Sequence, residues 1–275
     1  MIKILNLGFS YGHNVVLKDI TLTLEDGHIY GLLGENGVGK TTLLTLLSGL
    51  KKPMAGKIEI DGLIPFDRKP SLLTDIYYLS DEVADSNMTA MEYADTYGKF
   101  WENFDSEKFV NVMEVLENST DQKMNQMSFG QLKKTHIAFA LACNTKFLFM
   151  DEPTNGLDIP SKAQFRKALL KFTREDATIL ISTHQVRDLE SIIDPIIILD
   201  RQQVLLNAGI MEISEKLYFD YSGEAKAEAL YSEMTPGGNI QVLLNTTSEE
   251  SKVNIEALFN TVHKHKELTN KIFSK

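Results

Sequence analysis

The beginning of the chain alternates between apolar and polar residues, which is the pattern of half-buried strands. Asp26 and Gly27 form a turn between one alternating segment and a second segment that reads as a buried strand. Gly56 and the pair Asp61-Gly62 bracket a further short strand. We therefore expect strands over residues 2–7, 20–24, 28–33 and 57–60.

Between about residue 88 and residue 143 the apolar spacing becomes helical and rich in aromatic residues and methionine. Thr89 and Glu92 form a T-x-x-E capping box, and Ser128 and Gln131 form a second box. One helix is expected to begin at each box, and the second helix contains Cys143. The aromatic and methionine side chains of this region are expected to form its core.

Strands and helices then alternate, which predicts a parallel α/β sheet with right-handed connections. Beyond Gly209 the pattern loosens into a turn, a strand and an amphipathic helix marked by Ile255 and Leu258. The expected strands are 147–150, 178–182, 196–199, 204–207 and 240–244; the expected helices begin at about 161, at about 185 and near 255, and the expected turns are 200–203 and 236–238.

Charge and cysteine content narrow the class of protein. The chain carries 28 Lys and Arg against 38 Asp and Glu, a formal net charge of −10, which is the wrong sign for a protein that grips nucleic acid through its phosphates. The single cysteine cannot form an internal disulfide. The chain opens without a basic and then apolar leader, and its apolar stretches fall short of the ~18 residues that span a bilayer. We expect a cytoplasmic protein that binds no nucleic acid.

The strongest chemical signal is the run GENGVGKTT, which matches the phosphate-binding pattern G-x-x-x-x-G-K-[ST] between a predicted strand and a predicted helix. Glycines let successive backbone N–H groups point inward at an anion, and the helix adds its positive end. Lys40 is expected to reach the β- and γ-phosphates, and the Thr41 hydroxyl to ligate Mg²⁺. The candidate ATP-binding residues here are Gly34, Glu35, Asn36, Gly37, Val38, Gly39, Lys40, Thr41 and Thr42.

A second signal is the run FLFMDE, in which four apolar strand residues are followed by Asp151 and Glu152. A phosphate-binding loop needs an acidic residue on a neighbouring strand to hold its metal. We therefore expect Asp151 to bind Mg²⁺ through water, and Glu152 to polarise the water that attacks the phosphate.

With these two motifs, the chain resembles the ATP-binding subunit of an ATP-binding-cassette (ABC) transporter over roughly residues 2–207. Four short motifs add to the resemblance in the family's order. Tyr11 falls where the family places an aromatic that stacks on adenine, and MSFGQ matches the signature usually written LSGGQ. NGLD follows DEPT as the family's D-loop does, and STH places His184 at the switch histidine. Of the signature, we count Ser128, Gly130 and Gln131 as candidate nucleotide contacts.

The resemblance implies a P-loop α/β core with an antiparallel β layer, a helical subdomain over about 88–140, and a small α/β tail. The cassette is then 1–208 and the tail 209–275. It also implies ATP and Mg²⁺ as cofactors, with Glu152 and His184 positioning water and γ-phosphate. Partners are a second ATPase subunit in a head-to-tail dimer and a separate transmembrane permease. The protein is then held on the inner face of the cell membrane by that permease.

Two positions depart from the family's pattern. Phe129 replaces a signature glycine, and Asp81 stands where the family usually has the glutamine of its Q-loop. Asp81 can ligate Mg²⁺ or orient water, so we keep it as a candidate catalytic residue. The short tail resembles those of bacterial exporter subunits, which favours export. The alternative is a non-transport or regulatory ABC ATPase with impaired turnover.

Overall fold

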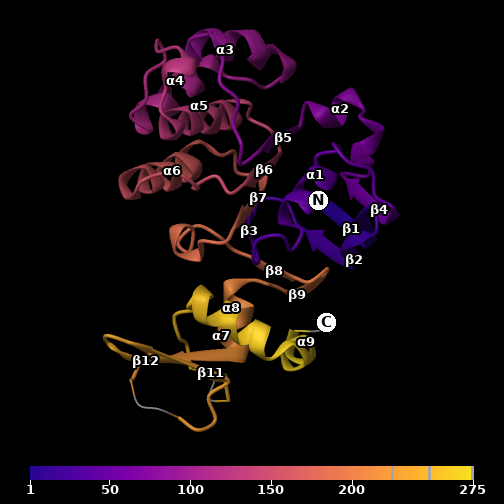
Figure 1. The fold of residues 1–275 in the computed structure, drawn as a ribbon, viewed down its shortest axis with the longest axis vertical. Coiled ribbons are helices and arrows are strands. Elements are labelled where there is room, and N and C mark those ends of the chain that lie inside the picture. Colours follow the sequence, from indigo (N-terminus) through magenta and orange to yellow (C-terminus); the bar gives the residue numbers. More distant parts are fainter. Residues whose placement is uncertain (224–225, 247–248, 274–275) are drawn as a thin grey trace.

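The computed structural model describes residues 1–223, 226–246 and 249–273. A six-stranded sheet runs through its middle (Figure 1), with the strand order β5-β6-β7-β3-β8-β9. All neighbours in this sheet are parallel except β9, which pairs antiparallel with β8. The expected α/β core is therefore confirmed. Its strands are β3 (Ile29–Leu33), β5 (Ile76–Leu79), β6 (Phe147–Asp151), β7 (Thr178–Thr183), β8 (Ile196–Asp200) and β9 (Gln203–Ala208).

The first strands form a separate antiparallel sheet in the order β2-β1-β4, as expected. Strands β1 (Ile2–Tyr11) and β2 (Asn14–Leu24) are longer than the alternation indicated, because a tight turn at Gly12 and His13 continues their pairing to Tyr11 and Asn14. Strand β4 spans Ala55–Ile60. The buried residues of these strands pack with the α1 helix, Lys40–Leu47, in one apolar cluster.

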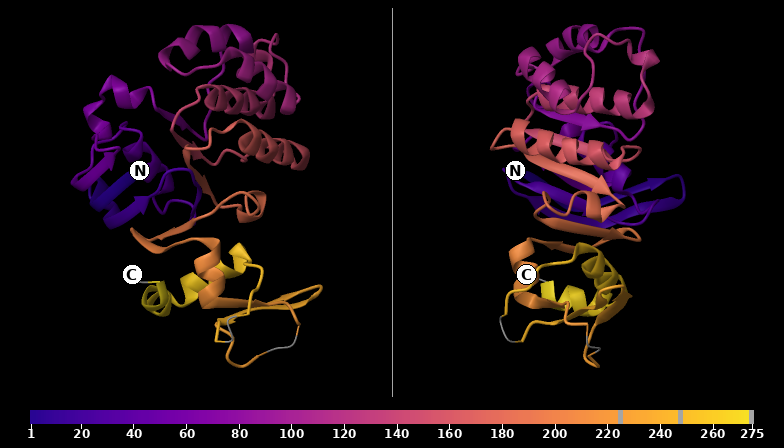
Figure 2. Two further views of the ribbon diagram at one scale, coloured as in Figure 1. Left: turned by 180° about the vertical axis from the view of Figure 1, so that it is seen from behind. Right: turned by 90° about the vertical axis from the view of Figure 1, so that its left-hand side faces the viewer.

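The helices between residues 90 and 172 lie at one end of the molecule, and the C-terminal elements lie at the opposite end (Figures 1 and 2). Both expected capping boxes are present, at Thr89 and Ser128. The helices up to residue 172 are η1 (Pro65–Asp67), α2 (Pro70–Leu73), α3 (Ala90–Tyr97), η2 (Gly98–Phe100), α4 (Ser106–Val115), η3 (Met124–Gln126), α5 (Phe129–Ala142) and α6 (Ile159–Phe172).

The prediction of a helix from about residue 185 is wrong. Only the short 3₁₀ turn η4, Val186–Asp188, forms there. The N–H groups of Asp188 and Leu189 bond only three residues back, to the carbonyl oxygens of Gln185 and Val186, as in a 3₁₀ turn. Arg166 donates from Nη1 to the Asp188 carbonyl oxygen at 2.9 Å. Pro195 follows shortly, and the residue before a proline disfavours helical backbone.

The C-terminal elements build a second small sheet in the order β10-β12-β11, covered by helices. The turn at 236–237, the strand over 240–244 and the helix near 255 are confirmed, whereas α7, α9, β10 and β11 were not expected. Leu258 and Val262 of α8 belong to the same buried cluster as the central sheet. The elements are α7 (Ile210–Lys216), β10 (Leu217–Asp220), β11 (Tyr231–Thr235), β12 (Gly238–Leu244), α8 (Ile255–Lys264) and α9 (Lys266–Phe273). No helix in the described ranges is long and apolar enough to cross a membrane.

Candidate functional site

The glycine-rich loop joins the end of β3 to the start of α1. A Cβ atom at Gly34 would lie 2.5 Å from the Leu199 carbonyl oxygen and 2.7 Å from Val38 Cγ2, so the loop can pass between β8 and Val38 only with glycine there. Gly39 has φ 110°, a backbone conformation that glycine adopts without strain. The predicted strand–loop–helix context of the motif is therefore present.

Lys40 is the buried cation of the site. Its ammonium group donates to the carbonyl oxygens of Gly34 at 2.7 Å and Glu35 at 3.1 Å, and lies 3.6 Å from Glu152 Oε1. Burial lowers the pKa of Lys40, and the charges of Glu152 and Asp151 oppose that effect. The ammonium group therefore lies against the first residues of the loop, with the Glu152 carboxylate beside it.

Asp151 is held between two hydroxyl groups at the end of β6. Thr41 Oγ1 donates to Asp151 Oδ2 at 2.6 Å, and Ser182 Oγ donates to Asp151 Oδ1 at 2.5 Å. The Asp151 residue is 3% exposed. This pairing brings together the two residues that the sequence predicts for Mg²⁺.

The donor set fits Mg²⁺, which prefers oxygen ligands, keeps several waters and is bound by one or two protein groups together with phosphate oxygens. Thr41 of α1 and Asp151 of β6 supply such oxygens and lie in contact with each other. Within the described residues, no group of three or more His, Cys, Asp or Glu side chains could enclose a metal ion. A metal held here would therefore complete its coordination with phosphate and water.

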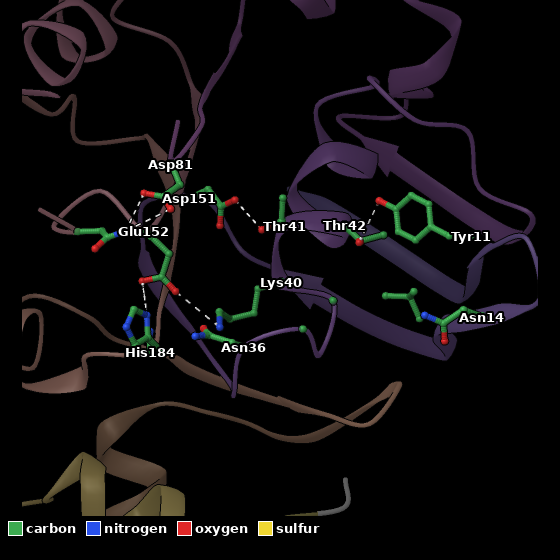
Figure 3. A pocket seen from close by; sticks show the side chains of 14 residues that line it. Tyr11, Asn14, Asn36, Lys40, Thr41, Thr42, Asp81, Asp151, Glu152 and His184 are labelled. Carbon is green, nitrogen blue, oxygen red and sulfur yellow. Dashed lines mark hydrogen bonds and ion pairs between the residues drawn. The ribbon is translucent and has the colours of Figure 1, made fainter. Parts of the chain in front are cut away.

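Glu152 lies beyond the end of β6 in a left-handed conformation, with φ 45°. For a non-glycine residue this conformation costs about 1 kcal/mol or more. Its Oε2 atom lies 2.9 Å from His184 Nδ1, and its backbone N–H donates to Ser182 Oγ at 3.0 Å. The Glu152 carboxylate therefore points at His184, as Figure 3 shows.

These side chains surround one cavity of about 510 Å³ (Figure 3). Three lining residues were not among the candidates: Asn14, Val16 and Asn155. The pairing of Tyr11 with Asn14 could have indicated the first, and the NGLD motif the last. The candidate residues that line the cavity are Tyr11, Asn36, Gly37, Gly39, Lys40, Thr41, Thr42, Asp81, Asp151, Glu152 and His184.

Six candidate residues do not line this cavity: Gly34, Glu35, Val38, Ser128, Gly130 and Gln131. The first three belong to the loop itself, and the last three lie at the N-terminus of α5. The three signature residues therefore do not face the cavity of their own chain.

Tyr11 stands at the far edge of the cavity from Glu152 in Figure 3. Its hydroxyl group lies 3.4 Å from Thr42 Oγ1, and its side chain is 49% exposed. The Lys51 ammonium group lies 4.8 Å from the ring centroid, a cation–π distance. A ring of this exposure, anchored at its hydroxyl, can stack on a base.

The two departures from the family's pattern both touch the D-loop. Asn155 Nδ2 donates to both carboxylate oxygens of Asp81, each at 3.2 Å. The Phe129 ring covers Gly156, where an added Cβ would lie 2.3 Å from Phe129 Cε1. Asp81 therefore faces the cavity from a fixed position, and Phe129 packs on the loop that follows Glu152.

Comparison with known proteins gives the same family from sequence and from structure. The family model described as ABC transporter matches residues 17–155. The uncharacterized ABC transporter ATP-binding protein YybJ of Bacillus subtilis is 34% identical over 225 residues, covering 80% of this chain and 98% of the relative. The bacitracin transport ATP-binding protein BcrA of Bacillus licheniformis is 30% identical over 241 residues, covering 85% and 79% of the two chains.

Among solved structures, the dimeric bacterial ABC transporter cassette MJ0796 superposes with a TM-score of 0.67 at 25% identity, covering 76% of this chain and 98% of that one. Family model, relatives and fold thus agree with the motifs around the cavity. The chain belongs to the ABC transporter family, among its ATP-binding subunits.

Proposed function

We propose that this chain binds and hydrolyses ATP, and so powers transport through a separate membrane permease. One observation carries the proposal: Lys40, Thr41, Asp151, Glu152 and His184 converge on a single cavity where β3, β6 and β7 end. Three parallel strands that end side by side place phosphate-binding, metal-binding and water-positioning groups within reach of one triphosphate.

The residues divide the reaction between them. The loop N–H groups and Lys40 hold the phosphates, while Thr41 and Asp151 would hold Mg²⁺, which would offset the phosphate charge. Glu152 orients the attacking water and accepts its proton. His184 fixes the Glu152 carboxylate through the 2.9 Å contact, so that the base keeps one orientation. Tyr11 stacks on the adenine ring.

The test of ATP binding is a calorimetric titration with Mg-ATP of the protein and of Lys40→Met. This variant keeps the length of the side chain and removes the charge that meets the phosphates. We expect its Kd to rise by at least about tenfold, the scale of one lost charge-assisted hydrogen bond to a phosphate. The matched control is Lys69→Met, at an exposed position before α2. Equal affinities of Lys40→Met and the control would contradict this role.

The signature supports a head-to-tail dimer as part of the proposal. Ser128 accepts from the Gln131 N–H at 3.3 Å and caps α5, which places a positive helix end outside the cavity of its own chain. A second copy would present this end to the γ-phosphate. Ser128→Arg is expected to abolish ATP-dependent dimerisation in size-exclusion chromatography while the monomer still binds Mg-ATP. Dimerisation of Ser128→Arg with ATP would contradict this arrangement.

Export, and a location on the inner face of the cell membrane, are also proposals. Of two similar proteins, one is named for bacitracin transport and the other for methionine import. The division into a cassette, 1–208, and a tail, 209–275, belongs to the same proposal. Crosslinking from residues 81–100 in membranes should capture a permease. Capture of a permease that works with a substrate-binding subunit would contradict export.

A regulatory subunit with impaired turnover is the second candidate. It is favoured by Asp81, whose carboxylate is already bonded to Asn155, and by Phe129, whose ring occupies the space above Gly156. An ATPase assay separates the two candidates, because the regulatory one binds ATP without releasing phosphate.

A further inference from the structure

The signature helix α5 carries a lysine that is fully buried and hydrogen-bonded to the loop after β5. Lys133 has no exposed surface, and burial lowers the pKa of its ammonium group while Asp81, Asp151 and Glu152 oppose that effect. Nζ donates to the Asp81 carbonyl oxygen at 2.7 Å and lies 3.3 Å from Asp81 Oδ1. A buried ammonium group is stable only when it is paired in this way.

A second α5 side chain holds the same loop. His136, one turn further along the helix, contacts the Ala84 carbonyl oxygen through Nε2 at 2.8 Å. The loop after β5 is therefore fastened to α5 at Asp81 and at Ala84. This leaves the Asp81 carboxylate in the wall of the cavity, where Figure 3 places it beside Asp151 and Glu152.

The position of Asp81 affects the net charge of the cavity wall. In the described part of the chain, the cavity wall contains three carboxylates, Asp81, Asp151 and Glu152, and one ammonium group, Lys40. A triphosphate that enters adds further negative charge. Asp151 can be neutralised by Mg²⁺, and Glu152 lies beside Lys40. The cationic partner of Asp81 is Lys133, which does not line the cavity.

We propose that Lys133 is a positioning residue for nucleotide binding: its buried charge neutralises Asp81, so that this carboxylate can stand in the cavity wall without repelling the triphosphate. The inference rests on the proposed function and adds a residue that does not itself touch the cavity. It predicts that ATP affinity follows the summed charge of positions 81 and 133.

The test is a calorimetric titration with Mg-ATP at low salt. Lys133→Met keeps the length of the side chain and leaves Asp81 uncompensated, so we expect Kd to rise on the order of tenfold, as for one charge acting over about 10 Å at an effective dielectric of about 20. Adding Asp81→Asn to Lys133→Met restores neutrality and should return Kd to the wild-type value. Both variants lose the hydrogen bonds from Lys133 Nζ to backbone carbonyl oxygens. The difference between their Kd values therefore reports the effect of the Asp81 carboxylate.

Lys134→Met is the matched control, because Lys134 lies on the same helix and bonds to Gln164 instead. Asp81→Asn alone tests the proposal without touching Lys133, and its Kd should fall below the wild-type value. An unchanged Kd in Lys133→Met, a double variant as weak as Lys133→Met, or a weaker Kd in Asp81→Asn would each overturn the proposal. Wild-type protein that binds no ATP would instead refute the proposed function.

Discussion

Ser182 is expected to hold the Asp151 carboxylate and the Glu152 backbone in place. Its hydroxyl group donates to Asp151 Oδ1 at 2.5 Å and accepts from the Glu152 N–H at 3.0 Å, and the residue has no exposed surface. Ser182→Ala removes this hydroxyl group and leaves Asp151 with Thr41 as its close donor. The Glu152 N–H keeps the Ser182 carbonyl oxygen as an acceptor at 3.2 Å.

The expected cost follows from these contacts. A hydrogen bond to a charged group contributes about 1.5–3 kcal/mol to stability. The unfolding entropy of a chain of 275 residues, at about 2.1 cal/mol/K per residue, is about 0.6 kcal/mol/K. Ser182→Ala should therefore lower Tm by about 3–5 °C. Asp151 keeps its contact with Thr41, and the Glu152 N–H keeps the Ser182 carbonyl oxygen, so both residues are held less tightly rather than released. We therefore expect kcat to fall between about tenfold and about a hundredfold.

Calorimetry and a phosphate-release assay on the same preparation measure both effects. Ser48→Ala is the control, because Ser48 is also buried but donates to the Thr45 carbonyl oxygen, away from the carboxylates. It should lose stability by about 1 kcal/mol, as for a neutral hydrogen bond, and keep its kcat. A Ser182→Ala protein with normal kcat would refute the reasoning, since the carboxylates would then be held without the hydroxyl group.

Two further predictions concern histidines. His184→Ala should lower kcat on the order of a hundredfold and leave the Kd of Mg-ATP unchanged, because His184 contacts Glu152 rather than the loop; a weaker Kd in titration calorimetry would contradict this. Burial lowers the pKa of His136, so the unfolded chain binds more protons and the free energy of unfolding falls as pH drops below about 6.5. In urea unfolding, His136→Gln should show a smaller fall between about pH 7 and about pH 5, and an identical fall would count against the burial argument.

The sequence predicts those parts of the site whose position depends on local backbone structure. The loop before Lys40, the strand before Asp151 and the cap at Ser128 each follow from short-range rules of turn, strand and helix formation, and all three are present. Thr41 and Asp151, each predicted to bind Mg²⁺, lie together because parallel strands end at the same edge of a sheet.

Long-range pairing accounts for what the sequence does not predict. Nothing in the helical pattern of α5 marks Lys133 as buried, because its partner Asp81 lies 52 positions earlier in the chain. The covering of Gly156 by Phe129 likewise depends on where α5 meets the D-loop. After Gln185 the local apolar spacing does not give a helix, because the backbone N–H groups bond three residues back and Arg166 from α6 contacts the same turn.

Glu152 is expected to act as the general base when the protein hydrolyses ATP in this cavity. The most direct measurement is the rate of phosphate release from Mg-ATP by the purified protein and by Glu152→Gln, with Glu114→Gln on the exposed side of α4 as control. We predict turnover by the wild type and the control, and a loss of roughly a hundredfold or more in Glu152→Gln, which still binds ATP and accumulates as a closed dimer. Turnover by Glu152→Gln at the wild-type rate would contradict the account.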